Sequence, residues 1–170
     1  MAAQLRIRPA RAGDLAALRP VIERAYRTDA GWTHEAHLVP TPRTDEASLA
    51  AILADPRERL LAAERGEAMI GCVQVGDRGD GLAYLGLLTV DPLCQAAGLG
   101  GRLIESAQAL AEAEFGATRM ELTVIDSREE LIAWYARRGY RPTGETRPFP
   151  VLLDPPLTMA VLEKALRQQG

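Results

Sequence analysis

The sequence predicts an α/β fold, a mixed, mostly antiparallel central sheet with helices on both faces. Three observations predict it. Segments with strand periodicity follow one another in the first half of the chain, amphipathic segments with helical periodicity lie between other strands, and a glycine-rich turn joins the apolar strand Leu82–Val90 to a helix. With 170 residues and 47% hydrophobic content, the chain is long enough for one proper core.

The chain opens with a strand and a helix. Leu5–Arg8 alternates apolar and polar residues and is followed by Pro9, as expected of a strand that ends there. Asp14 is predicted to cap the helix that follows, whose apolar residues recur at helical spacing. Pro20 lies inside this helix and is expected to bend or interrupt it, because proline cannot donate a backbone hydrogen bond.

A long irregular segment precedes the next elements. Thr28–Thr44 shows no periodicity, and a loop of this length is usually functional or disordered. Trp32 argues against disorder, because a large aromatic side chain normally covers apolar surface. A helix is predicted over Asp45–Ala54, and then a hairpin of the strands Arg59–Glu64 and Met69–Val75.

The strand Leu82–Val90 leads into the glycine-rich turn. Gly98, Gly100 and Gly101 stand at the start of an amphipathic helix that ends near Phe115. Glycine lacks the Cβ atom that would hold an anion off the backbone, and a helix N-terminus offers unpaired N–H groups. The turn therefore fits a phosphate group, and the alternative is a tight turn that binds nothing. A Walker-type loop and a dinucleotide fingerprint both require residues that are missing here.

The last third of the chain continues the alternation. A strand over Met120–Ile125 precedes a helix within Arg128–Tyr140. The strands Arg141–Thr146 and Leu157–Glu163 then flank a proline-rich crossing. No repeat, low-complexity segment or linker divides the sequence, so we expect a single domain.

Composition excludes several classes of partner. A net charge of −3 and the absence of a basic block argue against nucleic acid. Cys72 and Cys94 have no metal-like spacing, and His34 and His37 alone make a poor site, so no metal is expected. Without a signal peptide or a long apolar span, the sequence predicts a cytoplasmic protein that does not bind membranes.

Two motifs resemble the GNAT family of N-acetyltransferases. The first is the turn Gln95–Gly100, which reads Gln-x-x-Gly-x-Gly and follows Val90-Asp91-Pro92. The second is Tyr135 followed by Gly139-Tyr140. The resemblance covers nearly the whole chain and implies a GNAT-type fold over residues 1–170, one N-acetyltransferase domain. It also implies acetyl-CoA as co-substrate, a primary amine as acceptor and, as in many relatives, a homodimer.

The resemblance implies a set of residues that contact acetyl-CoA, from the end of the central strand, the turn and the start of the second motif. They are Leu88, Thr89, Val90, Gln95, Ala96, Ala97, Gly98, Leu99, Gly100, Gly101, Arg102 and Arg128. Arg128 stands where many relatives carry an asparagine that contacts the pantetheine arm.

The resemblance also implies catalytic residues. In the family, the tyrosine at the position of Tyr135 approaches the thioester sulfur and acts as general acid. The positions where some relatives carry a glutamate base are Tyr84 and Thr123 here, so no base is evident at either. Glu121 shares a strand face with Thr123 and is a candidate base, and so is Glu35, while a water chain is an equal alternative.

The region around the first two helices forms one wall of the acceptor site in the family. The residues expected there or beside the central strand are Trp32, His34, Glu35, Arg43 and Tyr84. The acidic residues near Trp32 favour a small cationic acceptor, and the alternative is that Trp32 only covers the core. A protein N-terminus or lysine remains open as acceptor. Two other functions also remain open, a non-catalytic acyl-CoA-binding regulatory module and an interaction protein whose turn binds nothing.

Overall fold

The computed structural model describes residues 4–27, 44–94, 98–150 and 154–166. Within these residues seven strands form one sheet in the order β1-β2-β3-β4-β5-β7-β6. They are β1 (Leu5–Pro9), β2 (Glu58–Arg65), β3 (Ala68–Asp77), β4 (Leu82–Val90), β5 (Arg119–Ile125), β6 (Arg141–Pro148) and β7 (Thr158–Ala165). Neighbouring strands are antiparallel except β4 and β5, which are parallel. The predicted mixed, mostly antiparallel sheet is confirmed.

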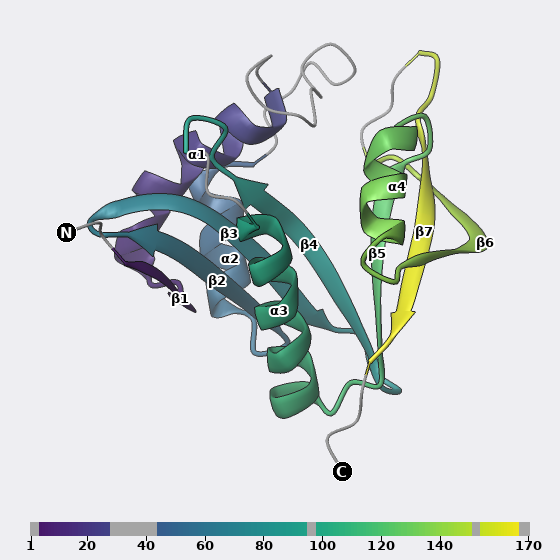
Figure 1. Cartoon of the computed structure of the whole chain (residues 1–170), viewed down its shortest axis with the longest axis horizontal. Helices are drawn as coiled ribbons and strands as arrows, with labels where there is room; N and C mark the ends of the chain where they lie inside the picture. Colours follow the sequence, from purple (N-terminus) through teal and green to yellow (C-terminus); the bar gives the residue numbers. More distant parts are fainter. Residues whose placement is uncertain (1–3, 28–43, 95–97, 151–153, 167–170) are drawn as a thin grey trace.

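Helices cover both faces of the sheet, as predicted (Figure 1). The helical elements are the short 3-10 turn η1 (Ala12–Asp14), α1 (Leu15–Arg27), α2 (Glu46–Ala54), α3 (Leu99–Phe115) and α4 (Glu129–Ala136). We call the side covered by α1 and α2 the α1 face, and the side covered by α3 and α4 the α3 face. Each face has its own cluster of buried side chains.

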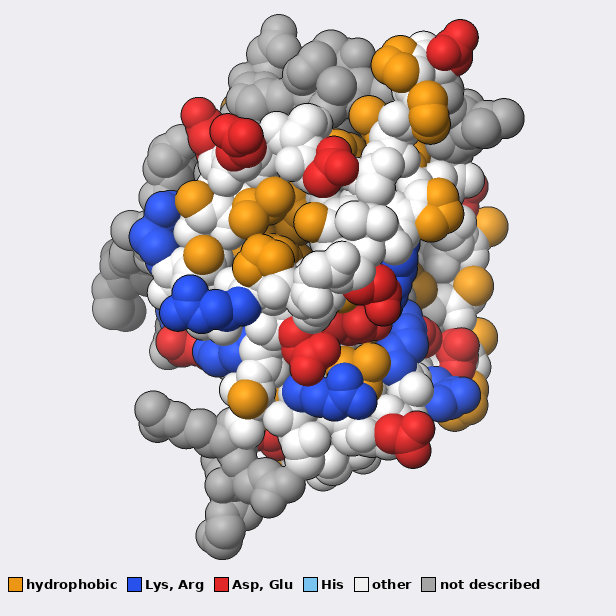
Figure 2. Space-filling view, turned by 90° about the vertical axis from the view of Figure 1, so that its right-hand side faces the viewer, with side chains coloured by type: hydrophobic (Ala, Val, Ile, Leu, Met, Phe, Trp, Pro, Cys, Tyr) orange, Lys and Arg blue, Asp and Glu red, His pale blue; other side chains and the backbone are white. Residues whose placement is uncertain are grey.

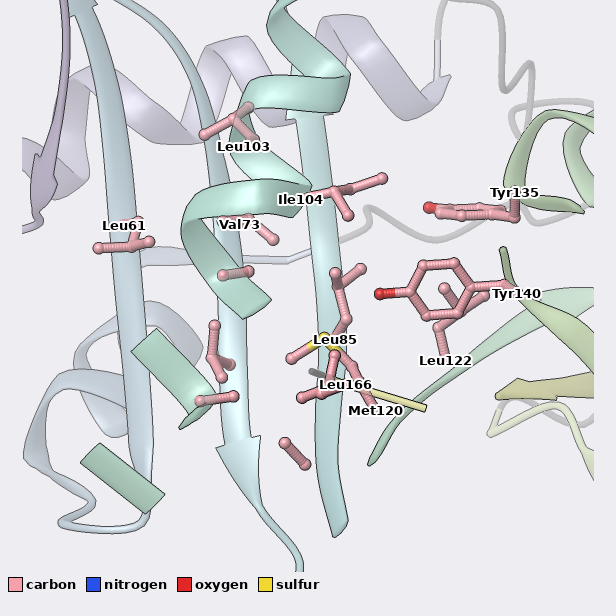
Figure 3. Packing of buried hydrophobic residues seen from close by; sticks show 14 of the residues in the cluster. Leu61, Val73, Leu85, Leu103, Ile104, Met120, Leu122, Tyr135, Tyr140 and Leu166 are labelled. Atoms are coloured by element: carbon pink, nitrogen blue, oxygen red, sulfur yellow. The ribbon is translucent and has the colours of Figure 1, made fainter. Parts of the chain in front are cut away.

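The larger cluster lies on the α3 face and joins both halves of the sheet. Side chains of β2, β3 and β4 meet those of α3, β5 and α4 there (Figure 3). Tyr140 is among the largest fully buried side chains. Its hydroxyl oxygen accepts a hydrogen bond from Gln108 Nε2 of α3 at 2.9 Å, which ties the end of α4 to α3.

The start of the chain differs from the sequence prediction in two details. Pro20 does not interrupt α1, which runs through it from Leu15 to Arg27. The carbonyl that Pro20 leaves without a helical donor belongs to Ala16, an exposed residue whose backbone can be hydrated. Asp14 ends η1 rather than capping α1, and its carboxylate accepts from the Arg11 N–H at 2.8 Å and pairs with Arg8.

The other element boundaries agree with prediction to within a few residues. Asp45 caps α2 by accepting from the Ser48 N–H, and Gly116 ends α3 in the left-handed conformation. The three strands before the glycine turn form the predicted meander. Across the ranges that the structure describes, no helix is both long and apolar enough to cross a membrane.

Candidate active site

The parallel strands β4 and β5 separate after a short paired segment, and we call this region the fork. Their pairing comprises Leu82–Arg119, Ala83–Met120 and Tyr84–Glu121. Beyond these pairs the two strands diverge, while β4 stays paired with β3 on its other side (Figure 1). The remainder of β4, Leu85–Val90, therefore presents one backbone edge to the fork.

A bulge in β4 accompanies this divergence. Between the pairs Gln74–Gly86 and Cys72–Thr89, two residues of β4 oppose one of β3. One of the two, Leu87, has a φ of 53°, which costs a leucine about 1–2 kcal/mol. Its side chain packs on the α1 face, whereas Leu85 packs on the α3 face. Bulges bend a strand and increase its twist, which explains why β4 leaves β5 here.

The bulge also fixes which backbone groups face the fork. The Asp91 N–H donates to the Ile70 carbonyl of β3 at 2.8 Å. Because backbone groups alternate along a strand, the carbonyls of Leu88 and Val90 then point away from β3, toward the fork. Thr89 turns inward, since it is buried and its hydroxyl donates to the Leu87 carbonyl at 3.0 Å.

The N-terminus of α3 lies next to the end of β4. Gly98 precedes the helix with a φ of 78°, a left-handed conformation that favours glycine. The first helical bond runs from the Arg102 N–H to the Gly98 carbonyl at 3.0 Å. The N–H groups of Leu99, Gly100 and Gly101 precede that bond, so no carbonyl of the helix itself pairs with them. No acidic residue lies in this first turn, so it suits an anion.

Gly100 leaves room for the Trp134 ring of α4 against the first turn of α3. A Cβ atom on Gly100 would stand 3.1 Å from Cζ2 of Trp134 and 3.8 Å from Cγ2 of Val90. Gly98 differs, because an added Cβ there meets nothing within 4 Å. The two glycines thus serve different purposes, backbone conformation at Gly98 and room for the Trp134 ring at Gly100.

Tyr135 reaches the fork from α4. Its ring is 7% exposed and lies edge-on to Trp134 and Tyr140, with centroid distances of 5.0 and 6.0 Å. Figure 3 shows the hydroxyl pointing from α4 toward Ile104 of α3. Among the described residues, none forms a hydrogen bond with this hydroxyl.

The surroundings of Tyr135 keep it protonated. Burial raises the pKa of its hydroxyl well above the ordinary value of 10.0, and the neighbouring hydroxyls of Tyr26, Tyr140 and Tyr84 raise it further. Tyr135 is therefore a neutral phenol with a proton to donate. This is the state that a general acid needs.

Glu121 lies on the α1 face of β5, buried beneath an arginine of β6. Arg147 donates to both of its carboxylate oxygens, at 3.1 and 3.0 Å, and also to Glu145 at 2.6 Å. These hydrogen bonds raise the pKa of Arg147. Figure 2 shows acidic and basic side chains next to one another on the side of the molecule that carries β6. Both carboxylate oxygens of Glu121 are therefore paired with Arg147.

Tyr84 stands where β4 and β5 are still paired, opposite Glu121 in register. Its neighbours Ala83 and Leu85 belong to the α3-face cluster, so its ring lies on the α1 face. Arg78 stacks over that ring at 4.8 Å from the centroid and donates to Glu58. Tyr84 therefore lies at the base of the fork, on the side from which α1 approaches.

Two residues of the fork were not expected from the sequence. Arg138 stacks on the Trp134 ring at 3.5 Å from its centroid and donates to the Trp134 carbonyl. It stands beside the first turn of α3, since a Cβ on Gly101 would lie 3.8 Å from its Nε. Burial lowers the pKa of Arg138. The other is Tyr26 of α1, whose hydroxyl donates to the Leu88 carbonyl at 2.6 Å.

The sequence predicted several further site residues. Arg102 is exposed in the first turn of α3, and Arg128 immediately precedes α4. Trp32, His34, Glu35 and Arg43 lie outside the described residues. The same holds for Gln95, Ala96 and Ala97. Among the residues that are described, no group of His, Cys, Asp and Glu side chains could hold a metal ion.

Comparisons with known proteins agree with this geometry. The family model of the acetyltransferase (GNAT) family matches residues 20–140, which include β4, α3 and Tyr135. A comparison with curated proteins found no match. Among solved structures, the ribosomal-protein-S18-alanine N-acetyltransferase of Escherichia coli aligns with a TM-score of 0.75 at 20% identity, over 98% of this chain and 97% of its own.

Two further structures share the fold. A Salmonella typhimurium protein solved with its cofactor acetyl-CoA has a TM-score of 0.70 at 20% identity, over 98% of this chain and 96% of its own. An N-acetyltransferase from Staphylococcus aureus Mu50 has a TM-score of 0.72 at 18% identity, over 97% of this chain and all of its own.

Proposed function

The chain belongs to the GNAT acetyltransferase family, and on this basis we propose that it transfers an acetyl group directly to a primary amine of a small molecule. As a family member it is an acyltransferase with acetyl-CoA as co-substrate. Residues 1–170 are proposed to form one N-acetyltransferase domain. Because acetyl-CoA is used inside cells, the cytoplasm is the proposed location.

The observation that carries the proposal is the fork, flanked by a helix end whose first N–H groups suit an anion and by a protonated tyrosine. The pantetheine arm would pair with the β4 edge at Leu88–Val90 as an added strand pairs with a sheet. The pyrophosphate oxygens would accept hydrogen bonds from the N–H groups of Leu99–Gly101. The thioester would then lie between β4 and Tyr135.

The reaction then needs one bond to form and one to break. The neutral amine nitrogen attacks the thioester carbonyl carbon and loses one N–H proton to solvent, the carbon–sulfur bond breaks, and the thiolate takes the Tyr135 proton. Tyr135 regains a proton from solvent. An alkyl amine of pKa near 10.4 must first be deprotonated, which costs about 4.6 kcal/mol at pH 7. Because Arg147 holds both oxygens of Glu121, solvent in the fork is the proposed proton acceptor.

The small cationic acceptor is proposed from the sequence around Trp32. Asp29 and Glu35 each stand within three positions of Trp32 in the sequence. Acidic groups beside an aromatic ring attract a cation. The Escherichia coli enzyme that shares the fold acts on an alanine of a ribosomal protein, so protein N-termini belong in the same test.

The test is a turnover screen with acetyl-CoA and a panel of small amines, amino acids and alanine-terminal peptides. CoA release is followed with a thiol reagent, and the acetylated product is identified by mass spectrometry. Acetylation of a small amine, with peptides at least tenfold slower in kcat/KM, supports the proposal. Preference for a peptide would move the function to protein acetylation. Binding of acetyl-CoA without any turnover would favour a regulatory module.

Arg138 is expected to contribute to acetyl-CoA binding. The variant Arg138→Met keeps an unbranched stem over Trp134 and removes the charge beside the first turn of α3. Calorimetry should show a Kd for acetyl-CoA raised roughly threefold to tenfold, since a partly exposed charge pair is worth about 1 kcal/mol. The matched control is Arg137→Met, an exposed neighbour that should leave the Kd within about twofold. Equal effects of both variants would remove Arg138 from the site.

Glu121 is expected to stabilise the fold rather than to act as base. Glu121→Gln should lower the free energy of unfolding by about 1–2 kcal/mol, because it breaks a largely buried ion pair whose arginine is 39% exposed. The value of kcat should fall less than about threefold, since general base catalysis contributes roughly 10² or more. Glu163→Gln, which removes the exposed pair with Arg119, is the stability control. A 100-fold loss of kcat with unchanged stability would make Glu121 the base.

A further inference from the structure

Tyr26 brings a side chain of α1 to the fork from the face opposite Tyr135. Its ring packs against the α1-face cluster, near the C-terminal end of α1. Its hydroxyl donates to the Leu88 carbonyl at 2.6 Å, at the β4 edge that β5 leaves uncovered. Tyr26 also disfavours ionisation of Tyr135, which comes from the opposite face of the sheet.

The contact with Leu88 determines what else the Tyr26 oxygen can bind. A phenol has one hydrogen to donate and lone pairs that accept. Because the Leu88 carbonyl takes the hydrogen, every further partner of this oxygen must be a donor. A carbonyl or phosphate oxygen cannot fill that role, whereas an amine N–H can.

We propose that Tyr26 positions the acceptor amine, its hydroxyl oxygen accepting a hydrogen bond from the amine N–H at the edge of β4. The inference rests on the proposed function, because it concerns the acceptor of the same reaction. The two tyrosines then have complementary tasks. Tyr135, whose hydroxyl donates to no described residue, gives its proton to the departing thiolate. Tyr26 accepts a hydrogen bond from the attacking amine.

The geometry suits direct transfer. The Leu88 carbonyl holds the Tyr26 hydroxyl at the same segment of β4 along which the pantetheine arm is placed. An N–H directed to Tyr26 leaves the nitrogen lone pair to face the thioester carbonyl, which is the orientation that attack requires. Tyr26 moves no proton in this step, because the amine proton passes to solvent.

The test compares hydroxyl deletions in Tyr26→Phe and Tyr140→Phe with an amine that the wild-type protein acetylates. In Tyr26→Phe, KM for the amine should rise roughly fivefold to thirtyfold, and more than kcat falls, because one hydrogen bond to the substrate is lost. The Kd for acetyl-CoA should change less than about threefold. In Tyr140→Phe, which loses the bond to Gln108, the melting temperature should fall while KM for the amine stays at the wild-type value.

Each outcome is informative. A wild-type KM in an active Tyr26→Phe variant would overturn this inference and leave the proposed function standing. A lower melting temperature together with weaker acetyl-CoA binding and an unchanged KM for the amine would overturn the inference, because Tyr26 would then only stabilise β4. Should Tyr26→Phe be unstable at 25 °C, the series is run at a lower temperature at which acetyl-CoA binding shows the variant folded. Absence of turnover by the wild-type protein with every amine would overturn the proposed function and this inference with it.

Discussion

Tyr135→Phe is expected to lower kcat by roughly 10²–10⁴, the usual contribution of a positioned general acid. The substitution keeps the ring that packs edge-on against Trp134 and Tyr140 and removes only the hydroxyl. Since none of the described residues forms a hydrogen bond with that hydroxyl, melting temperature and Kd for acetyl-CoA should change little. Steady-state kinetics, calorimetry and thermal unfolding measure the three quantities.

The pH profile provides a second readout of the same residue. A general acid must be protonated to act. Burial raises the pKa of the Tyr135 hydroxyl, so its ionisation should lower kcat only above pH 10. The wild-type kcat should therefore show no decline from Tyr135 between pH 7 and pH 10. Tyr135→Ala, which also removes the ring, should be unstable. A fully active Tyr135→Phe variant would instead assign protonation of the thiolate to solvent.

Gly100→Val is expected to lower the affinity for acetyl-CoA by at least about 30-fold. Its Cβ would stand 3.1 Å from the Trp134 ring, so we expect the ring and the first turn of α3 to move apart. Displaced N–H groups lose charge-assisted hydrogen bonds to the pyrophosphate, each worth about 1.5–3 kcal/mol. Overpacking should also lower the free energy of unfolding by about 1–3 kcal/mol. Calorimetry with acetyl-CoA and with CoA measures the affinity.

Gly13→Val is the matched control for Gly100→Val. Gly13 lies in η1, and a Cβ added there meets nothing within 4 Å. The same substitution at this site should leave the Kd within about twofold. An affinity for CoA in Gly100→Val equal to that of the wild-type protein would show that the first turn of α3 does not hold the pyrophosphate.

Local sequence patterns were sufficient for most of the fold. The apolar run of β4, the helical spacing of α3 and the glycine at its end each depend on neighbouring residues, and the structure confirms them. Pro20 was expected to bend or interrupt α1, and interruption is wrong because α1 runs through it. The sequence does not show this, since the exposure of the Ala16 carbonyl depends on how α1 lies on the sheet.

The site was less accessible to sequence reasoning, because its contacts join residues far apart in the chain. Leu87 gives no sign of a positive φ, since leucine rarely adopts one, yet the bulge there opens the fork. The contact of Tyr26 with Leu88 spans 62 positions, and that of Arg147 with Glu121 spans 26. Arg138 lies within the second motif, directly before Gly139, and this position was the one sign in the sequence that it could belong to the site.

Amide hydrogen exchange with and without acetyl-CoA tests most directly whether the fork holds the co-substrate. Binding along β4 should slow exchange in peptides that cover Leu88–Val90 and Leu99–Arg102, because their N–H groups gain partners from the pantetheine arm and the pyrophosphate. Leu82–Tyr84, already paired with β5, should change little and serves as internal reference. Slowed exchange elsewhere, with both fork segments unaffected at saturating acetyl-CoA, would contradict the placement of the co-substrate at the fork.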